Sequence, residues 1–212
     1  MKLLKMICQH IDPKLALRSV ACALVLLITL NVCGFSAKCD IIRENVLRLH
    51  VLANSDSIED QALKLKVRDG VLKVSEDVFK NCQSVEEAEA AAKENLPLFK
   101  SVAEKIVSDN GYGYAVNVEL GDTWFETRDY DGFSLPAGNY EALRVQIGEA
   151  KGKNWWCVMF PSVCIPAATK DKKDFSKALS DSQSDIVTRP QRYKARFKIV
   201  EIFQNIVKSV RG

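Results

Sequence analysis

The sequence predicts an α+β fold: a two-layer domain with a mixed or antiparallel sheet of about five strands, three helices on one face and a C-terminal amphipathic helix. Apolar residues recur at helical spacing between positions 57 and 109, and this spacing returns between 193 and 210. Between 112 and 160 they alternate with polar residues, which is typical of strands. Each element therefore has one apolar face, as two packed layers require.

The first 39 residues have the pattern of a leader that precedes a single domain of residues 40–212. The leader begins with basic residues and continues into an apolar run at 20–30, which is the order found in secretory signals. Residues 15–35 approach the length of a membrane span, but Arg18, Ser19 and Asn31 interrupt them. A cleaved signal peptide and a retained membrane anchor both remain open, and both place the domain outside the cytoplasm.

The charge of the chain is concentrated in the leader. The whole chain has a formal charge of +3, whereas residues 40–212 hold 25 basic and 26 acidic residues and are almost neutral. A protein that binds nucleic acid needs a clustered basic surface to neutralise phosphates. We therefore expect no nucleic-acid partner.

The domain begins with a strand at 46–53. In this segment Leu47, Leu49 and Val51 form one apolar face, while Arg48 and His50 point the other way.

The first helix of the domain is predicted from Ser57 to about Phe79. Ser57 precedes Asp60 by three positions, which is the spacing of an N-terminal capping box. Five apolar positions spaced by three or four form its buried stripe: Leu63, Val67, Val71, Val74 and Val78. Lys64 and Arg68 are expected on the solvent-facing side.

Two shorter helices follow. Ser84 and Glu87 form a capping box for a helix that ends near Asn95. Pro97 suits the first turn of the next helix, which ends at 109–111, where Asn110 or Gly111 can adopt a left-handed conformation.

Four strands are predicted in the second half of the domain, at 112–120, 123–128, 141–147 and 155–160. Gly121 and Asp122 indicate a turn between the first two strands. The last strand is apolar on both faces, which predicts a central strand covered on both sides. A flexible loop is expected at 167–190, with a little helix around 175–179. The final helix, at 193–210, is amphipathic and basic.

Three cysteines lie in the domain. Cys157 and Cys164 are seven positions apart with Pro161 between them, so a turn there would allow a disulfide. The alternative is two buried thiols, and the sequence leaves both open. Cys82 is expected to be unpaired. No pair of cysteines has the spacing of a zinc ribbon or a thioredoxin-like redox site.

Few residues suggest catalysis. His50 is the one histidine outside the leader, and no motif for a metal or a cofactor is present, so neither is expected. The enzymatic alternative is an exported cell-envelope hydrolase that uses His50 with the carboxylate of Asp56 or Asp60, or with Cys157.

Six polar side chains gather where the first strand meets the first helix: Asn54, Ser55, Asp56, Asp60, Gln61 and Lys64. One or two side-chain oxygens are enough to bond the free backbone N–H groups at a helix start. Asp60, Gln61 and Lys64 are therefore left over, because capping does not require them. The set is therefore either a solvated helix cap or a surface that binds a partner.

Several long segments resemble the stage II sporulation protein R family. They are RLHVLANSDS (48–57), EDQALKLKVRD (59–69), LPAGNYEALRVQIG (135–148), GKNWWCVMFP (152–161) with Cys164, and RFKIVE (196–201). The resemblance covers about residues 43–165 and the final helix.

This resemblance implies an exported signalling protein that is not an enzyme. Members of the family are made in the forespore and exported into the space between its membrane and that of the mother cell. There they activate a membrane-embedded aspartic protease of the mother cell, which processes the precursor of sigma factor E. The implied partner is that protease, and contact with the membrane is expected only through the leader or an anchor at residues 15–35.

Overall fold

The computed structural model describes residues 12–130, 133–161 and 181–211. The chain forms two compact units, Met1–Lys38 and Cys39–Gly212. Helix α2 (Pro13–Glu44) contains most of the first unit, and its stretch from Lys14 to Glu44 is long and apolar enough to cross a membrane. A signal sequence near an N-terminus can be equally long and apolar, so this stretch is compatible with either a signal sequence or a membrane anchor.

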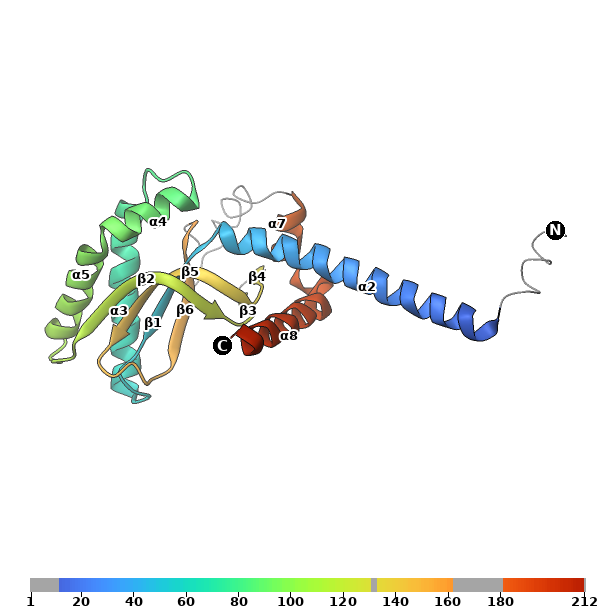
Figure 1. Cartoon of the computed structure of the whole chain (residues 1–212). Coiled ribbons are helices and arrows are strands. Elements are labelled where there is room, and N and C mark those ends of the chain that lie inside the picture. The colour runs from blue at the N-terminus through green and yellow to red at the C-terminus, as the bar shows by residue number, and fades with distance from the viewer. Residues whose placement is uncertain (1–11, 131–132, 162–180, 212) are drawn as a thin grey trace. The chain divides into compact units, whose positions relative to one another are not determined.

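The second unit is built on a four-stranded mixed sheet in the order β2-β5-β1-β6 (Figure 1). The four strands are β1 (Leu47–Leu52), β2 (Val116–Phe125), β5 (Gly138–Ile147) and β6 (Asn154–Phe160). Strand β1 pairs in parallel with β5 and antiparallel with β6, and β2 pairs antiparallel with β5. A separate two-stranded hairpin consists of β3 (Arg128–Tyr130) and β4 (Phe133–Leu135).

Three helices cover one face of the sheet, as the sequence predicts. They are α3 (Ile58–Val78), α4 (Val85–Glu94) and α5 (Leu96–Asp109). Residues in register across a sheet share a face, and Leu49 is in register with Leu143 and Cys157. This row belongs to the core shared with Val67 and Phe99 of the helices. The α+β fold class is therefore confirmed.

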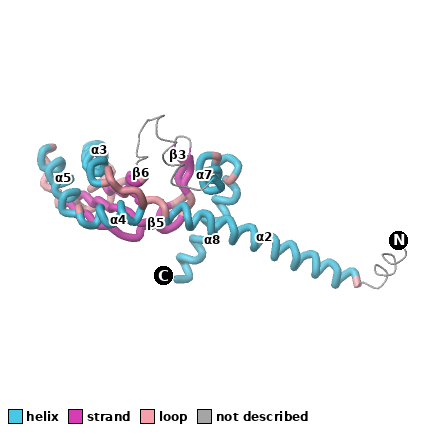
Figure 2. The backbone as a smooth tube through the Cα atoms, turned by 90° about the horizontal axis from the view of Figure 1, so that it is seen from above, coloured by secondary structure: helices cyan, strands magenta, loops and turns pink. Residues whose placement is uncertain are grey.

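The opposite face carries the second half of the core. There His50 lies in register with Trp156, and Phe125 packs edge-on against both Trp156 and Tyr140. Helix α7 (Asp181–Thr188) packs against β4 and is followed by a 3-10 turn (Pro190–Arg192) and by α8 (Lys194–Arg211). Figure 2 shows α3, α4 and α5 at one end of this unit and α7 and α8 at the other.

The helix starts follow the predicted capping pattern. The Ser57 hydroxyl accepts a hydrogen bond from the backbone N–H of Asp60, and the Ser84 hydroxyl accepts one from Glu87. Helix α5 begins at Leu96 with Pro97 in its first turn. These contacts are local, so the residue types at each start suffice to predict them.

The predicted position of β6 is wrong. We expected a central strand, but β6 is at the edge of the sheet and β1 lies between two neighbours. Strand β6 is apolar on both faces because Cys157 and Met159 belong to the core beneath the helices, while Trp156 stacks on His50 of the opposite face. The apolar composition of β6 is therefore explained by the burial of both its faces, and not by a central position in the sheet.

Two other expectations are also corrected. Gly121 and Asp122 do not form a turn, because they stay in register with Ala142 and Glu141 and β2 continues through them. Pairing with β5 thus overrides the local tendency to turn. The expected loop at 167–190 contains α7, in which Ile186 and Val187 are buried. The short helix expected around 175–179 lies outside the described residues.

Candidate functional site

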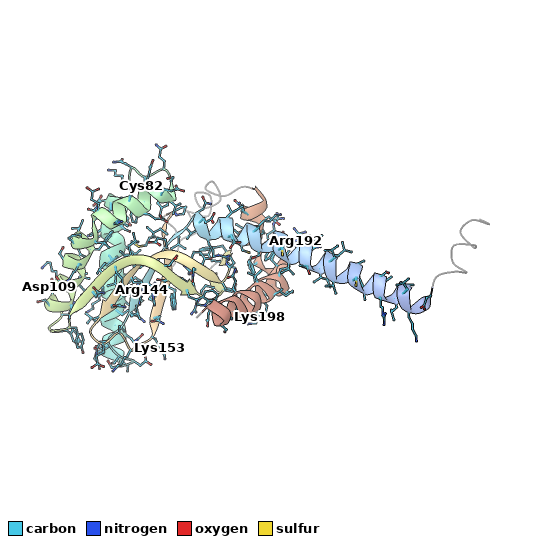
Figure 3. All side chains as sticks on the ribbon, viewed as in Figure 1. Cys82, Asp109, Arg144, Lys153, Arg192 and Lys198 are labelled. Carbon is cyan, nitrogen blue, oxygen red and sulfur yellow. The ribbon has the colours of Figure 1, made fainter. Side chains whose placement is uncertain are left out.

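Two connections meet at one end of the sheet and form what we call the loop tip, residues 53–64 and 148–154. The first contains the β1–α3 connection and the start of α3, and the second joins β5 to β6. The backbone N–H groups of Lys151 and Gly152 donate to the carbonyls of Asn54 and Ala53 at 3.2 and 3.0 Å. Figure 3 labels Lys153, whose backbone N–H donates to the Asp56 carboxylate at 2.6 Å. The loop tip is therefore held by contacts between segments about 95 residues apart.

Asp60 is the centre of the loop tip. Its side chain is 4% exposed, and one carboxylate oxygen accepts hydrogen bonds from Asn54 at 2.8 Å and from Ser55 at 2.6 Å. Burial alone would raise the pKa of Asp60, but these hydrogen bonds outweigh burial and lower it. Asp60 is thus a buried carboxylate that stabilises the loop tip in its ionised form.

Lys64 and Gln61 are also bonded within the loop tip. The Lys64 ammonium donates to the side-chain oxygen of Gln61 at 2.6 Å and to the carbonyl of Lys153 at 2.9 Å. The Gln61 amide donates to the carbonyl of Ser55 at 2.8 Å. The expectation that Asp60, Gln61 and Lys64 are left over is therefore wrong. The sequence does not show that Ser55 bonds Asp60 and Gln61, or that Lys153 lies against Lys64.

Arg68 is buried as well, one turn further along α3. The expected solvent-facing position of Lys64 and Arg68 is wrong, since both side chains lie against β6 and the connection before it. The Arg68 guanidinium lies 4.2 Å from the centroid of Trp155 and pairs with Asp69 at 2.6 Å. The aromatic ring and the carboxylate thus stabilise the positive charge of Arg68 at a position from which water is largely excluded.

Two glycines allow the two connections to approach each other closely. A Cβ atom at Gly152 would lie 2.1 Å from the carbonyl oxygen of Ser55, which is a backbone atom. Gly148 adopts a positive φ of 58°, and a Cβ there would lie 2.2 Å from the side-chain oxygen of Asn54. Glycine at these two positions is the signal in the sequence that predicts a close contact, although it does not name the partner.

The loop tip presents a small mixed surface to solvent. Ile58 is 84% exposed, more than any other large apolar side chain of the described residues. Asp56 and Glu59 lie beside it in the chain and are exposed, as are Lys151 and Lys153 of the second connection. The sequence does not distinguish Ile58, because an apolar residue at the start of a helix resembles part of its buried stripe.

A second unusual group is the buried Arg48. Its side chain is fully buried, its guanidinium lies 3.8 Å from the centroid of Phe125 and 4.8 Å from that of Tyr140, and it donates to the hydroxyl of Tyr130. Its Nε and Nη1 atoms have no hydrogen-bond partner among the described residues. Burial therefore lowers the pKa of Arg48, and the aromatic faces partly replace water around the cation.

His50 does not have the surroundings of a catalytic histidine. Its ring stacks on Trp156 with centroids 3.9 Å apart, and neither ring nitrogen has a hydrogen-bond partner in the described part of the chain. Burial lowers the pKa of His50 to about 4, although the nearby Asn154 opposes this. Cys157 is in register with Leu49, so it lies on the opposite face of the sheet from His50. The pairing of His50 with Cys157 that the hydrolase alternative considers is therefore wrong.

Carboxylates do not complete such a site either. Asp60 is bonded to Asn54 and Ser55, and Asp56 to the backbone of Lys153. Among the residues with described positions, no group of three or more His, Cys, Asp or Glu side chains could hold a metal ion.

The disulfide prediction is resolved only for one cysteine. Cys157 is disulfide-bonded, whereas Cys164 lies outside the described residues. Their pairing therefore stays a prediction. Cys82 is a free thiol, and burial raises its pKa.

The comparisons with known proteins identify the family. The family model described as stage II sporulation protein R matches residues 43–170. The chain is also 35% identical over 160 residues to stage II sporulation protein R of Bacillus subtilis strain 168, which covers 73% of this chain and 70% of that relative. No solved structure matches the chain. The matched region contains every strand of the main sheet and the whole loop tip, and the chain belongs to the stage II sporulation protein R family.

Proposed function

We propose that this protein is an exported signal of sporulation that acts as a ligand and not as an enzyme. It is made in the forespore and crosses the forespore membrane by means of its N-terminal apolar helix. In the space between the two membranes it activates a membrane-embedded aspartic protease of the mother cell. That protease then processes the precursor of sigma factor E.

Family membership is the observation that carries this proposal, because it gives the chain a role in sporulation. The apolar stretch from Lys14 to Glu44 is compatible with a signal sequence or an anchor. The polar side chains of the loop tip are bonded to one another, which is how a rigid recognition surface is built and is unlike a site that awaits a substrate.

We further propose that the loop tip contacts the protease. The sequence offers Asn54, Ser55, Asp56, Asp60, Gln61 and Lys64 as candidates for this contact, and the structure changes how they would contribute. Asp60 and Lys64 are buried and hold the shape of the loop tip, whereas Ile58, Asp56 and Glu59 are available for contact. An exposed aliphatic side chain surrounded by charges resembles the anchor of a small interface with its polar rim.

The test is co-expression of the full chain with the protease and the sigma factor precursor in a host that does not sporulate. Processing of the precursor should require the full chain and should fail when residues 1–38 are removed, since the shortened protein stays in the wrong compartment. Processing without any added chain, or full processing by the shortened chain, contradicts the proposal.

The Ile58→Ser variant tests the contact in the same assay. Because Ile58 is 84% exposed, its replacement should change the free energy of unfolding by less than about 0.5 kcal/mol. We expect it to reduce processing at least tenfold. Leu98→Ser is the matched control, since Leu98 is an exposed apolar residue of α5 outside the loop tip. If both variants process the precursor normally, the receptor contact lies elsewhere on the domain.

A further inference from the structure

Helix α8 carries two apolar stripes, and only one of them is buried. Phe197 and Val200 are 3% and 1% exposed and belong to the buried stripe. Ile199 and Ile202 are 46% and 51% exposed. Successive helical residues are turned by about 100°, so Ile199 and Ile202 lie on one side of the helix, away from Phe197. The helix therefore exposes aliphatic side chains that its packing in the domain does not require.

The apolar spacing that contains Ile199 and Ile202 continues in the sequence toward the C-terminus. Apolar residues follow Ile202 at positions 206 and 210, each one helical turn further on. Their side chains lie outside the described set, but the backbone of these positions is helical. Among the described helices, α8 has the strongest separation of apolar and polar residues.

Basic residues accompany this stripe. Helix α8 holds five Lys or Arg residues and one acid, Glu201. Lys194 and Arg196 are exposed, and Lys198, labelled in Figure 3, is 67% exposed and pairs with Glu201 at 2.7 Å. The rest of the domain, residues 40–193, contains 20 basic and 25 acidic residues. Positive charge is thus concentrated on the helix that exposes the aliphatic stripe.

This combination fits the surface of an anionic bilayer. A helix that lies in a membrane interface has a low mean hydropathy, a large apolar face and lysines or arginines beside it. The acidic remainder of the domain would be repelled by the same surface, which favours an orientation with α8 against the lipid. A second copy of α8 is a poorer partner for the exposed stripe, because two helices with the same positive charge repel each other.

We propose that α8 binds an anionic membrane surface, with Ile199 and Ile202 among the acyl chains near the headgroups and its basic residues against the headgroup phosphates. Such binding would hold the domain close to a membrane independently of helix α2. The proposal concerns lipid binding and does not depend on activation of a protease, so the two proposals can fail separately.

The experiment measures amide hydrogen exchange of the full chain in lipid vesicles. One set of vesicles contains phosphatidylcholine alone, and the other contains equal parts of phosphatidylcholine and phosphatidylglycerol. The full chain is reconstituted into both sets at the same protein-to-lipid ratio, so that the domain has the same surface density on each. We expect exchange in residues 194–211 to be at least threefold slower on anionic vesicles, and this difference to shrink in high salt because salt screens the headgroup charge.

The variant Ile199→Gln/Ile202→Gln should lose this protection. Glutamine is a good helix former, and unchanged exchange in β1 and α5 would show that the variant is folded. Leu98→Gln, at an exposed apolar position of α5, is the matched control and should keep the protection. Equal exchange on both kinds of vesicle, or protection that survives in the double variant, overturns the proposal. Protection that depends on protein concentration and not on lipid also overturns it, since it assigns the stripe to a second copy.

Discussion

Asp60 shows how a single carboxylate can organise the connection that leads into a helix. One of its carboxylate oxygens accepts hydrogen bonds from the side chains of Asn54 and Ser55, and its backbone N–H donates to the Ser57 hydroxyl. The same loop tip includes Lys64, which bonds the carbonyl of Lys153 in the other connection. Buried donors that lose their acceptor are costly, so the residue should matter for folding as well as for recognition.

We predict that Asp60→Ala lowers the free energy of unfolding by about 2 kcal/mol, because Asn54 and Ser55 lose their acceptor. Urea denaturation at pH 7 measures the loss. Since the native pKa of Asp60 is below its usual value, this stabilisation is present above about pH 4 and disappears as the pH falls through the native pKa. Glu59→Ala, next to it but exposed, should have no measurable effect.

His50 should make the stability of the domain fall as the pH is lowered from 7 to 5. Its native pKa is about 4, whereas an unfolded histidine titrates near 6.5, so the unfolded state takes up the proton first. Arg48 and Arg144 also disfavour a charged ring at this site. The loss should be about 2 kcal/mol, and it should be absent in His50→Phe, which keeps the stacking on Trp156. Urea denaturation at both pH values provides the comparison, and equal pH dependence in the two proteins would mean that the ring is not desolvated.

At the scale of elements, the close approach of the two connections should depend on Gly152. We predict that Gly152→Ala costs about 2 kcal/mol, because the added Cβ would lie 2.1 Å from a backbone oxygen that can move only with the chain. Gly113→Ala is the control, since a Cβ there meets no atom within 4 Å. Thermal unfolding of both variants gives the comparison, and equal midpoints would show that the loop tip is loosely packed.

The positions of most elements can be predicted because they depend on local periodicity. The helix from Ser57, the helix from Ser84 and the strand that contains Leu49 all follow from spacing and capping. The order of strands in the sheet cannot be predicted in this way. The sequence of β6 shows that both faces are covered, but the edge position of β6 depends on which strands pair, and this is a long-range property.

The residues of the loop tip could be predicted, but the role of each could not. The sequence shows six polar side chains around the start of α3, and these do gather there. It does not show that residues 148–154 contact Lys64 and Asn54, since these contacts join segments that are far apart in the chain. Arg48 was expected only to point away from the core face, because the aromatic residues around it come from three other segments.

For the whole molecule, we predict that a chain from Cys39 to Gly212 unfolds cooperatively, because these residues form one compact unit. Within this unit Cys39 and Ile42 are fully buried, and Arg43 donates to the carbonyl of Ala137 at 2.9 Å. A chain that begins at Asn45 should lose about 3 kcal/mol from the lost apolar burial and hydrogen bond. Thermal denaturation of the two chains tests this, and equal midpoints would show that the end of α2 adds nothing to the domain.

The parallel pairing of β1 with β5 determines when the domain can fold during synthesis. Strand β1 is the first strand to leave the ribosome, yet its two neighbours span Gly138–Ile147 and Asn154–Phe160. The inner strand therefore has no partner for about 90 residues of elongation, and closing such long loops is slow. A nascent chain in this state can form the local helices α3, α4 and α5 but cannot complete its sheet until β5 and β6 have emerged. The export that we propose would then act on a domain whose sheet is still open, which is the state that a narrow translocation channel requires.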